Sequence, residues 1–365
     1  MMNQINWAMW ASFWLTLSLC TICYVHAEEA PPIKPNRLLI GTVIDTTSTD
    51  IVRDAINFVK SVRVFGGTMN DATILVGITS SYNNCASDSS LLPTLLDLNV
   101  EVVLLTQTVK HAKTLNKFTM FELFDPIKYD YFLWIDADII VFDDPMPYLR
   151  MHKYPGEVEC VPDFYSYMRR FGTVNTSSEY WNPSLPTFHL LGEYETAPSG
   201  LCNTGLLFFD SLSLSTFIEG LHRIMSNMSY LEQHGRDRFV DSLIFTEVVQ
   251  EKALQVSALP FSLNFMALFE IEMQEEAVVT DIVMAHLVSD TEFYCVRTPS
   301  EVPGGADACA CVYRNKLMSQ KGSLLKKTIE EKILTSADIC MIFAGAPLPR
   351  VQTPKPFVEV LDNGS

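Results

Sequence analysis

The stretch YFLWIDADIIVFDDP, residues 131–145, joins an apolar run to two aspartates, Asp136 and Asp138. An apolar run of this kind, at 131–135, is typical of a strand buried on both faces of a parallel sheet. Ligands of open α/β sheets bind beyond the carboxyl ends of the strands, which is where the two aspartates would lie. Two desolvated carboxylates repel each other unless a cation lies between them, so the pair predicts a site for a hard divalent ion.

Strand and helix patterns alternate around this stretch. We expect strands at 37–44, 72–79, 100–105, 131–135, 204–209 and 282–287, and helices at about 51–62, 91–98, 115–124, 213–225, 237–249 and 324–339. This alternation predicts an α/β fold with a mostly parallel sheet and helical crossovers, and the length allows two compact domains or one large one. The segment 163–199 interrupts it with eight aromatic residues and several prolines, which predicts a long functional loop whose aromatic faces suit sugar rings. Anchoring of an insertion to the core is the alternative for those aromatics.

Composition limits the class of partner. The chain has 365 residues, with 48% hydrophobic and 19% charged side chains, so it has the composition of a globular protein. Its formal charge of −17 disfavours nucleic acid and other polyanions, because phosphate contacts need clustered Lys and Arg. A phosphate-bearing ligand would need local positive charge, and a bound metal ion would supply it.

The amino-terminal segment is a targeting sequence by its composition. Residues 7–27 are apolar and uncharged, which predicts a signal peptide or signal anchor at 1–27. A short linker at 28–36, a main domain at 37–299 and an extension at 300–365 follow. Sequons at Asn175 and Asn227 fit a glycoprotein of the secretory pathway, in the lumen of the ER or Golgi, secreted, or type II membrane-anchored. Seven cysteines follow the leader, enough for two or three disulfides in such a compartment.

Four further stretches accompany the Asp-x-Asp pair. They are Asn116-Lys117 before an apolar helix, 202–210 with Asn203 and Gly205, 237–245 with Asp241, and 285–289 with His286. In this order they resemble the GT-A glycosyltransferases, especially the glycogenin-like family 8, over roughly residues 37–294. The resemblance implies the Rossmann-like fold of the nucleotide-diphospho-sugar transferases, a single large domain whose mixed, mostly parallel sheet is flanked by helices.

The resemblance also implies roles for single residues. Metal ligands would be Asp136, Asp138 and His286, holding Mn²⁺ or Mg²⁺; donor-binding residues would be Thr42, Lys117, Asp136, Ala137, Asp138, Asn203, Gly205 and Asp241; catalytic residues would be Asn203 and Asp241. Each has a structural alternative: Lys117 as a solvated cation at a helix start, His286 as a core histidine, Asn203 as a turn residue, and Asp241 as a helix-start acid.

The resemblance implies metal-dependent transfer of a hexosyl or similar unit from a nucleotide-diphosphate sugar to a glycan, protein or lipid-linked acceptor. We expect the donor to be UDP-linked and the configuration at the anomeric carbon to be retained. The chain departs from the family pattern at Ser242, Ser289 and Glu292. A catalytically degenerate sugar- or nucleotide-binding module on the same fold is therefore an alternative. A phosphatase in which Asp136 is the nucleophile is another, but three strands precede its motif.

Overall fold

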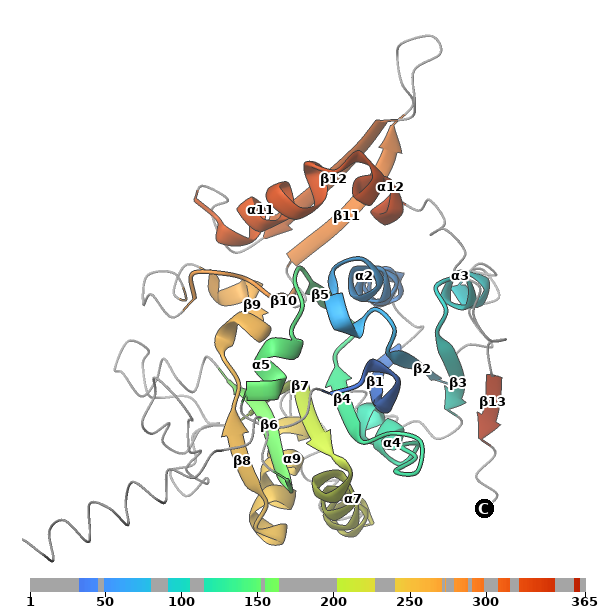
Figure 1. Ribbon diagram of the computed structural model, residues 1–365, viewed down its shortest axis with the longest axis vertical. Helices are drawn as coiled ribbons and strands as arrows, with labels where there is room; N and C mark the ends of the chain where they lie inside the picture. Colours follow the sequence, from blue (N-terminus) through green and yellow to red (C-terminus); the bar gives the residue numbers. More distant parts are fainter. Residues whose placement is uncertain are drawn as a thin grey trace, which may run out of the picture. The chain divides into compact units, whose positions relative to one another are not determined.

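An eight-stranded mixed sheet forms the centre of the protein (Figure 1). Its strands, in spatial order, are β13 (Val358–Leu361), β3 (Glu101–Leu105), β2 (Thr73–Thr79), β1 (Leu38–Ile44), β4 (Tyr131–Ile135), β7 (Cys202–Asp210), β6 (Glu157–Pro162) and β8 (Gln255–Ala258). Strand β7 runs antiparallel to its neighbours β4 and β6, and the other neighbouring pairs are parallel. The expected mixed, mostly parallel sheet is confirmed.

The computed structural model describes residues 33–44, 49–79, 91–105, 115–151, 155–163, 202–226, 240–270, 273, 279–287, 291–298, 308–315, 322–344 and 358–361. The expected leader, the sequons Asn175 and Asn227, Ser289 and all but the first residue of the 163–199 loop lie outside these ranges. Within them, no helix has both the length and the apolar character needed to cross a membrane.

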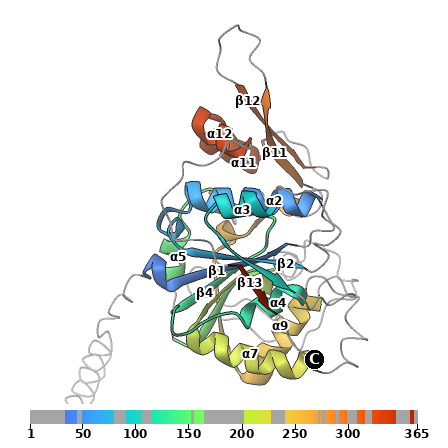
Figure 2. The same cartoon turned by 90° about the vertical axis from the view of Figure 1, so that its right-hand side faces the viewer.

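Helices cover both faces of the sheet (Figure 2). One face carries α2 (Thr49–Phe65) and α3 (Leu91–Asp97), and the other carries α4 (Asn116–Phe121), α7 (Ser211–Met225) and α9 (Val240–Lys252). Helix α7 starts at a capping box, in which Asp210 accepts from the backbone of Ser213 and Ser213 accepts from that of Asp210. Strand β4 places buried side chains in both layers, Leu133 against the α2 face and Trp134 against the α4 face.

A small second sheet lies next to the carboxyl end of β4. It consists of β5 (Ile139–Val141), β10 (Met284–His286) and β9 (Phe265–Met266), in that order. Ser61 of α2 fixes β5 against the helix, because its Oγ accepts from the backbone N–H of Val141 at 2.9 Å. Strand β10 pairs antiparallel with β5 and parallel with β9.

The carboxyl-terminal region adds a hairpin and helices. Strands β11 (Thr291–Thr298) and β12 (Ala308–Asn315) pair over their full length, and α11 (Leu324–Ile329), the π-helical turn η7 (Glu330–Leu334) and α12 (Ala337–Phe343) follow. The single helix expected at 324–339 was wrong, because Ser336 caps a new helix by accepting from Ile339 N at 3.3 Å. The hairpin spans the expected boundary at residue 299, and that boundary stays a prediction.

Glu270 joins this region to the rest of the fold. Its buried carboxylate accepts hydrogen bonds from Ser323 Oγ at 2.6 Å, Leu325 N at 2.8 Å and Tyr313 Oη at 3.1 Å. Glu270 directly follows the turn η6 (Ala267–Phe269), which in turn follows β9. The end of β9 is thereby linked to β12 and to the start of α11.

Two disulfides lie among the described residues. Cys160–Cys202 joins the carboxyl end of β6 to the start of β7, and Cys295–Cys311 joins the paired strands β11 and β12. The Sγ of Cys340 lies 3.2 Å from that of Cys311. The first disulfide fixes the backbone next to Asn203, one of the expected site residues.

Candidate functional site

Three side chains with the chemistry of metal ligands meet where β4 passes into β5. One ligand atom each of Asp136, Asp138 and His286 lies within 4.8 Å of the other two. Backbone pairing brings them together, because His286 is in register with Ile139 and Leu287 N donates to the carbonyl of Asp138 at 2.9 Å. The predicted convergence of these three residues is observed.

The antiparallel strand β7 contributes its first residues to the same place. Because β7 runs opposite to β4, its start lies at the edge where β4 ends, and Asp136 N donates to Gly205 O at 2.8 Å. Asn203 Oδ1 accepts from Gly205 N at 2.9 Å, and its Nδ2 contacts Met266 Sδ at 3.5 Å. Both turn and site roles therefore remain open for Asn203, whose side chain is only partly buried.

Lys117 is a buried cation between two carboxylates. Its Nζ lies 2.8 Å from Asp241 Oδ2 and 3.1 Å from Asp136 Oδ1. It also donates to the carbonyl of Thr204 at 3.3 Å, and Thr204 Oγ1 donates to Asp241 Oδ2 at 2.7 Å. With 3% of its surface exposed, Lys117 is not a solvated helix-start cation. It joins α4, β4, β7 and α9 at one point.

Asp136 is fixed by a further donor. The indole Nε1 of Trp134 donates to Asp136 Oδ1 at 2.8 Å, and Lys117 Nζ lies 5.9 Å from the centre of the Trp134 ring. Trp134 is buried in the layer beneath α4. A buried indole N–H normally finds an acceptor, and here that acceptor is one of the candidate metal ligands.

Burial and neighbouring charges shift the acid–base properties of the cluster in opposite directions. Burial and the charge of Asp138 raise the pKa of Asp136, although Lys117 opposes them. Burial would also raise the pKa of Asp138 and of Asp241, but His286 and Lys117 respectively hold these pKa values below the ordinary range. Uneven pKa values among close carboxylates are typical of sites that bind cations or carry out acid–base chemistry.

His286 lies between an amide and a carboxylate. Its Nδ1 lies 3.1 Å from Asn264 Oδ1, and its Nε2 lies 3.2 Å from Asp138 Oδ1. Burial alone would lower the pKa of His286, but the Asp138 carboxylate raises it above the ordinary value. The ring packs over Gly205, where an added Cβ would lie 2.8 Å from Cε1, so the close approach requires glycine.

The donor set fits a hard divalent cation. Two carboxylates and one imidazole are ligands that Mn²⁺ accepts, and carboxylates suit Mg²⁺. Adjacent ligands around an ion with bonds near 2.1 Å are about 3 Å apart, close to the separation of His286 Nε2 and Asp138 Oδ1. Asp138 and Asp136 keep 33% and 24% of their side-chain surface exposed, so an ion can reach both from solvent.

The structure places the other predicted residues as follows. Ala137 lies between the two aspartates and is buried. Thr42 is buried in β1, and its Oγ1 has no hydrogen-bond partner among the described residues, so it is not joined to the cluster by a hydrogen bond. Ser242 is buried with its Oγ 3.5 Å from Thr204 Oγ1.

Sequence reasoning missed Asn264. It stands one residue before β9, a strand of two residues that has no periodicity of its own. Its link to His286 depends on the pairing of β9 with β10, and nothing in the sequence near either residue signals that pairing.

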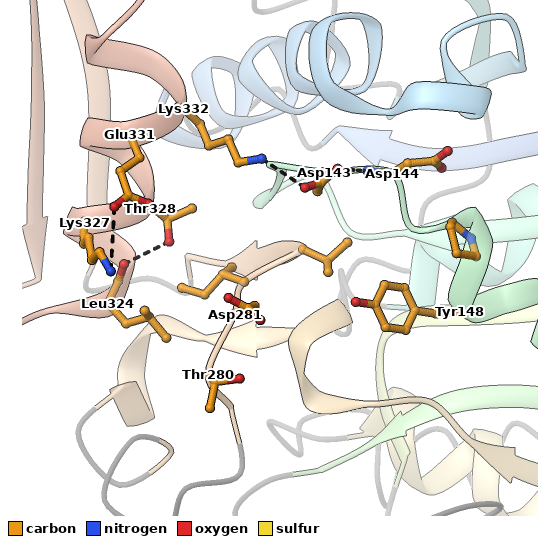
Figure 3. A pocket seen from close by; sticks show the side chains of 13 residues that line it. Asp143, Asp144, Tyr148, Thr280, Asp281, Leu324, Lys327, Thr328, Glu331 and Lys332 are labelled. Atoms are coloured by element: carbon orange, nitrogen blue, oxygen red, sulfur yellow. Dashed lines mark hydrogen bonds and ion pairs between the residues drawn. The ribbon is translucent and has the colours of Figure 1, made fainter.

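A separate pocket of about 610 Å³ lies between the core and the carboxyl-terminal helices (Figure 3). Its lining includes Asp143, Tyr148 and Asp281 and, from α11 and η7, Lys327 and Lys332. An ion pair of 2.9 Å joins Lys332 Nζ to Asp143 Oδ2 along its wall. None of its lining residues belongs to the Asp136–Asp138–His286 cluster, which is therefore a different place in the fold.

Comparison with known proteins finds similar solved structures at low identity. No protein-family model and no curated protein sequence matches the chain. The bifunctional glycosyltransferase WbbM matches with 14% identity and a TM-score of 0.43, over 71% of this chain and 47% of WbbM. The galactosyltransferase LgtC, solved with donor and acceptor sugar analogues, matches with 14% identity and a TM-score of 0.41, over 69% of this chain and 87% of LgtC. Mouse xyloside xylosyltransferase 1 matches with 11% identity and a TM-score of 0.40, over 68% of this chain and 96% of that protein. The chain thus spans about half the length of WbbM.

Proposed function

We propose that the protein is a metal-dependent glycosyltransferase that moves a hexosyl or similar unit from a nucleotide-diphosphate sugar to a glycan, protein or lipid-linked acceptor. The observation that carries the proposal is the meeting of Asp136, Asp138 and His286 beyond the end of β4, at the edge where open α/β sheets bind ligands. The motifs that resemble the GT-A transferases of family 8 converge on this one place. A UDP-linked donor and retention of configuration are part of the proposal.

Asp136, Asp138 and His286 would hold Mn²⁺ or Mg²⁺. When bound, such an ion supplies positive charge that stabilises a diphosphate leaving group. Lys117 contacts both Asp136 and Asp241, so its positive charge holds the two carboxylates in place and reduces the repulsion between them. Trp134 holds the same Asp136 oxygen through its indole N–H.

Asn203 and Asp241 would bind sugar hydroxyls at the side of the ion. Asp241 remains ionised through Lys117 and can stabilise positive charge that develops on the sugar ring. Asn203 presents a partly exposed amide from the start of β7, which the Cys160–Cys202 disulfide fixes.

Location and acceptor are parts of the same proposal. The apolar segment at 7–27 and the sequons support a protein that acts in the secretory pathway, in the ER or Golgi lumen, secreted, or anchored as a type II membrane protein. The charge of −17 favours a neutral acceptor. Disulfides between β6 and β7 and between β11 and β12 agree with an oxidising compartment.

A catalytically degenerate binding module is the second candidate. One observation favours it: Ser242, where many family members have Gln, has a short side chain without an amide, and its Oγ lies 3.5 Å from Thr204 Oγ1. Such a module would bind the donor without turning it over. A phosphatase would instead release inorganic phosphate from a phosphomonoester.

The test is thermal stability of the protein with a panel of UDP- and GDP-sugars, with and without Mn²⁺, followed by measurement of released nucleotide. A ligand at a hundredfold excess over its Kd stabilises the folded state by about 2.7 kcal/mol. We expect one donor to raise the Tm only with Mn²⁺, and we expect Asp138→Ala to abolish the shift. Asp143→Ala is the matched control, because Asp143 follows β5 but pairs with Lys332 outside the cluster.

The outcomes separate the candidates. A metal-dependent shift with release of UDP supports the transferase. A shift without turnover in the presence of varied acceptors supports the binding module. No change of Tm with any donor would contradict both the transferase and the binding module. Release of inorganic phosphate from a phosphomonoester would favour the phosphatase.

A further inference from the structure

We propose that Asn264 is a positioning residue for the metal site, which sets the hydrogen of the His286 ring on Nδ1 and leaves Nε2 free to bind the ion. The inference rests on the proposed function in one respect, that the cluster binds a divalent cation. The inference assigns a role to Asn264, which precedes β9 and which no sequence motif indicates.

The two ring nitrogens of His286 face different partners. Nδ1 lies 3.1 Å from the amide oxygen of Asn264, whereas Nε2 lies 3.2 Å from Asp138 Oδ1, on the side of the two carboxylates. An amide oxygen only accepts, so with the amide in this orientation Nδ1 is the donor of the contact. In a neutral ring Nε2 then presents its lone pair toward Asp138 and Asp136, the form in which imidazole binds a metal.

Backbone hydrogen bonds fix the distance between Asn264 and the ring. Asn264 ends the turn η5 (Phe261–Leu263), with its N–H donating to Phe261 O at 3.1 Å. The next residues form β9, and Met266 is in register with His286. Because Asn264 directly precedes β9, and β9 pairs with the strand that carries His286, the amide approaches the ring without a flexible connection.

The Asn264 side chain is buried, so the orientation of its amide decides which hydrogen bond it makes with His286. Asn264 is 1% exposed, so water does not compete for the Nδ1 hydrogen bond. Its Nδ2 has no hydrogen-bond partner among the described residues. A residue retained for folding alone would gain from an apolar replacement, since an unpaired buried donor costs about 1–3 kcal/mol. The amide is therefore better explained by what its oxygen does for His286.

The experiment measures Mn²⁺ binding to the full protein by isothermal titration calorimetry. Asn264→Leu keeps the size of the side chain and removes the acceptor, and we expect it to weaken Mn²⁺ binding about 10- to 100-fold, the usual loss when a partner of a metal-binding histidine is removed. Asn264→Asp keeps an acceptor at the same place, and we expect its affinity to stay within about threefold of the wild type.

A second measurement reads the ring itself. With Mg²⁺ bound, ¹H–¹⁵N spectra should show the Nδ1 hydrogen of His286 held in a hydrogen bond in the wild type, and in Asn264→Leu this hydrogen should be lost to exchange with solvent. Asn57→Leu is the matched control, because Asn57 is also buried but donates to Phe293 O at 3.4 Å, away from the cluster. Its Mn²⁺ affinity should equal that of the wild type.

Each result decides one question. If the wild type binds no Mn²⁺, the metal site of the proposed function fails, and the inference fails with it. If the wild type binds and Asn264→Leu binds equally well, the inference is overturned while the metal site stands. Equal losses in Asn264→Leu and Asn264→Asp would also overturn it, because they would show a packing effect.

Discussion

Replacing Lys117 by methionine would leave the partly buried Asp136 and the buried Asp241 without the cation that both contact. The distances of 3.1 and 2.8 Å correspond to attractions of roughly 5–6 kcal/mol each at an effective dielectric constant of 20. Part of this attraction offsets the desolvation of the three charges, and removal of one partner from a buried pair costs about 3–5 kcal/mol. We expect Lys117→Met to lower the free energy of unfolding by that amount.

Urea denaturation, followed by circular dichroism, measures this loss. Asp241→Asn in the Lys117→Met background should recover part of it, because it removes one uncompensated charge. The same substitution at another buried lysine, Lys60→Met, is the control, since no hydrogen bond or ion pair to the other described residues is seen for Lys60. A loss below about 1 kcal/mol for Lys117→Met, or no recovery in the double variant, would refute the view that Lys117 holds the acids together.

Three other substitutions test neighbouring parts of the structure. Burial lowers the pKa of Lys60 from 10.5 to about 8, so at neutral pH Lys60→Met should be more stable than the wild type by roughly 3 kcal/mol. This difference in the free energy of unfolding should disappear between pH 8 and pH 10.5, because the folded wild type has then lost the proton that the unfolded chain still binds. Urea denaturation across that range measures the difference. A constant difference would contradict the lowered pKa of Lys60. Gly205→Ala should displace His286 and weaken Mn²⁺ binding at least about tenfold by calorimetry, and unchanged affinity would show that the ring has room to move. Lys332→Ala breaks a half-exposed ion pair with Asp143 and should change the free energy of unfolding by less than about 1 kcal/mol; a larger loss would mean that this pair is stronger than its exposure indicates.

The sequence predicts those parts of the site that lie directly at the ends of long apolar strands. Asp136 and Asp138 follow a five-residue buried strand, so the apolar run itself predicts that they lie at the edge of a sheet, whereas His286, the last residue of β10, was expected at the site from the family resemblance. Lys117 was predicted as a site residue, but its part in holding Asp136 and Asp241 together comes from tertiary structure. The antiparallel direction of β7 brings Thr204 next to Lys117, and a hydrophobic pattern does not indicate the direction of a strand.

The remaining contacts depend on short elements. Strands β5 and β9 have three and two residues, too few for a period to be recognised. Their places are fixed by pairing with β10, between segments far apart in the chain. The helix expected at 324–339 has the right apolar spacing, but the side chain of Ser336 satisfies a backbone N–H that a continuous helix would bond to a carbonyl.

The contacts of Glu270 bear on the order in which the protein can be completed during synthesis. A ribosome delivers Asn264 and His286 well before Tyr313, Ser323 and Leu325, the three residues that satisfy the Glu270 carboxylate. Until those residues emerge, a carboxylate that the native fold buries lacks these three hydrogen bonds, and the chain just after β9 lacks this link to the carboxyl-terminal region. The nascent chain can thus pair β1, β2 and β4 early, but it completes the surroundings of Asn264 and His286 only when the carboxyl-terminal region has folded.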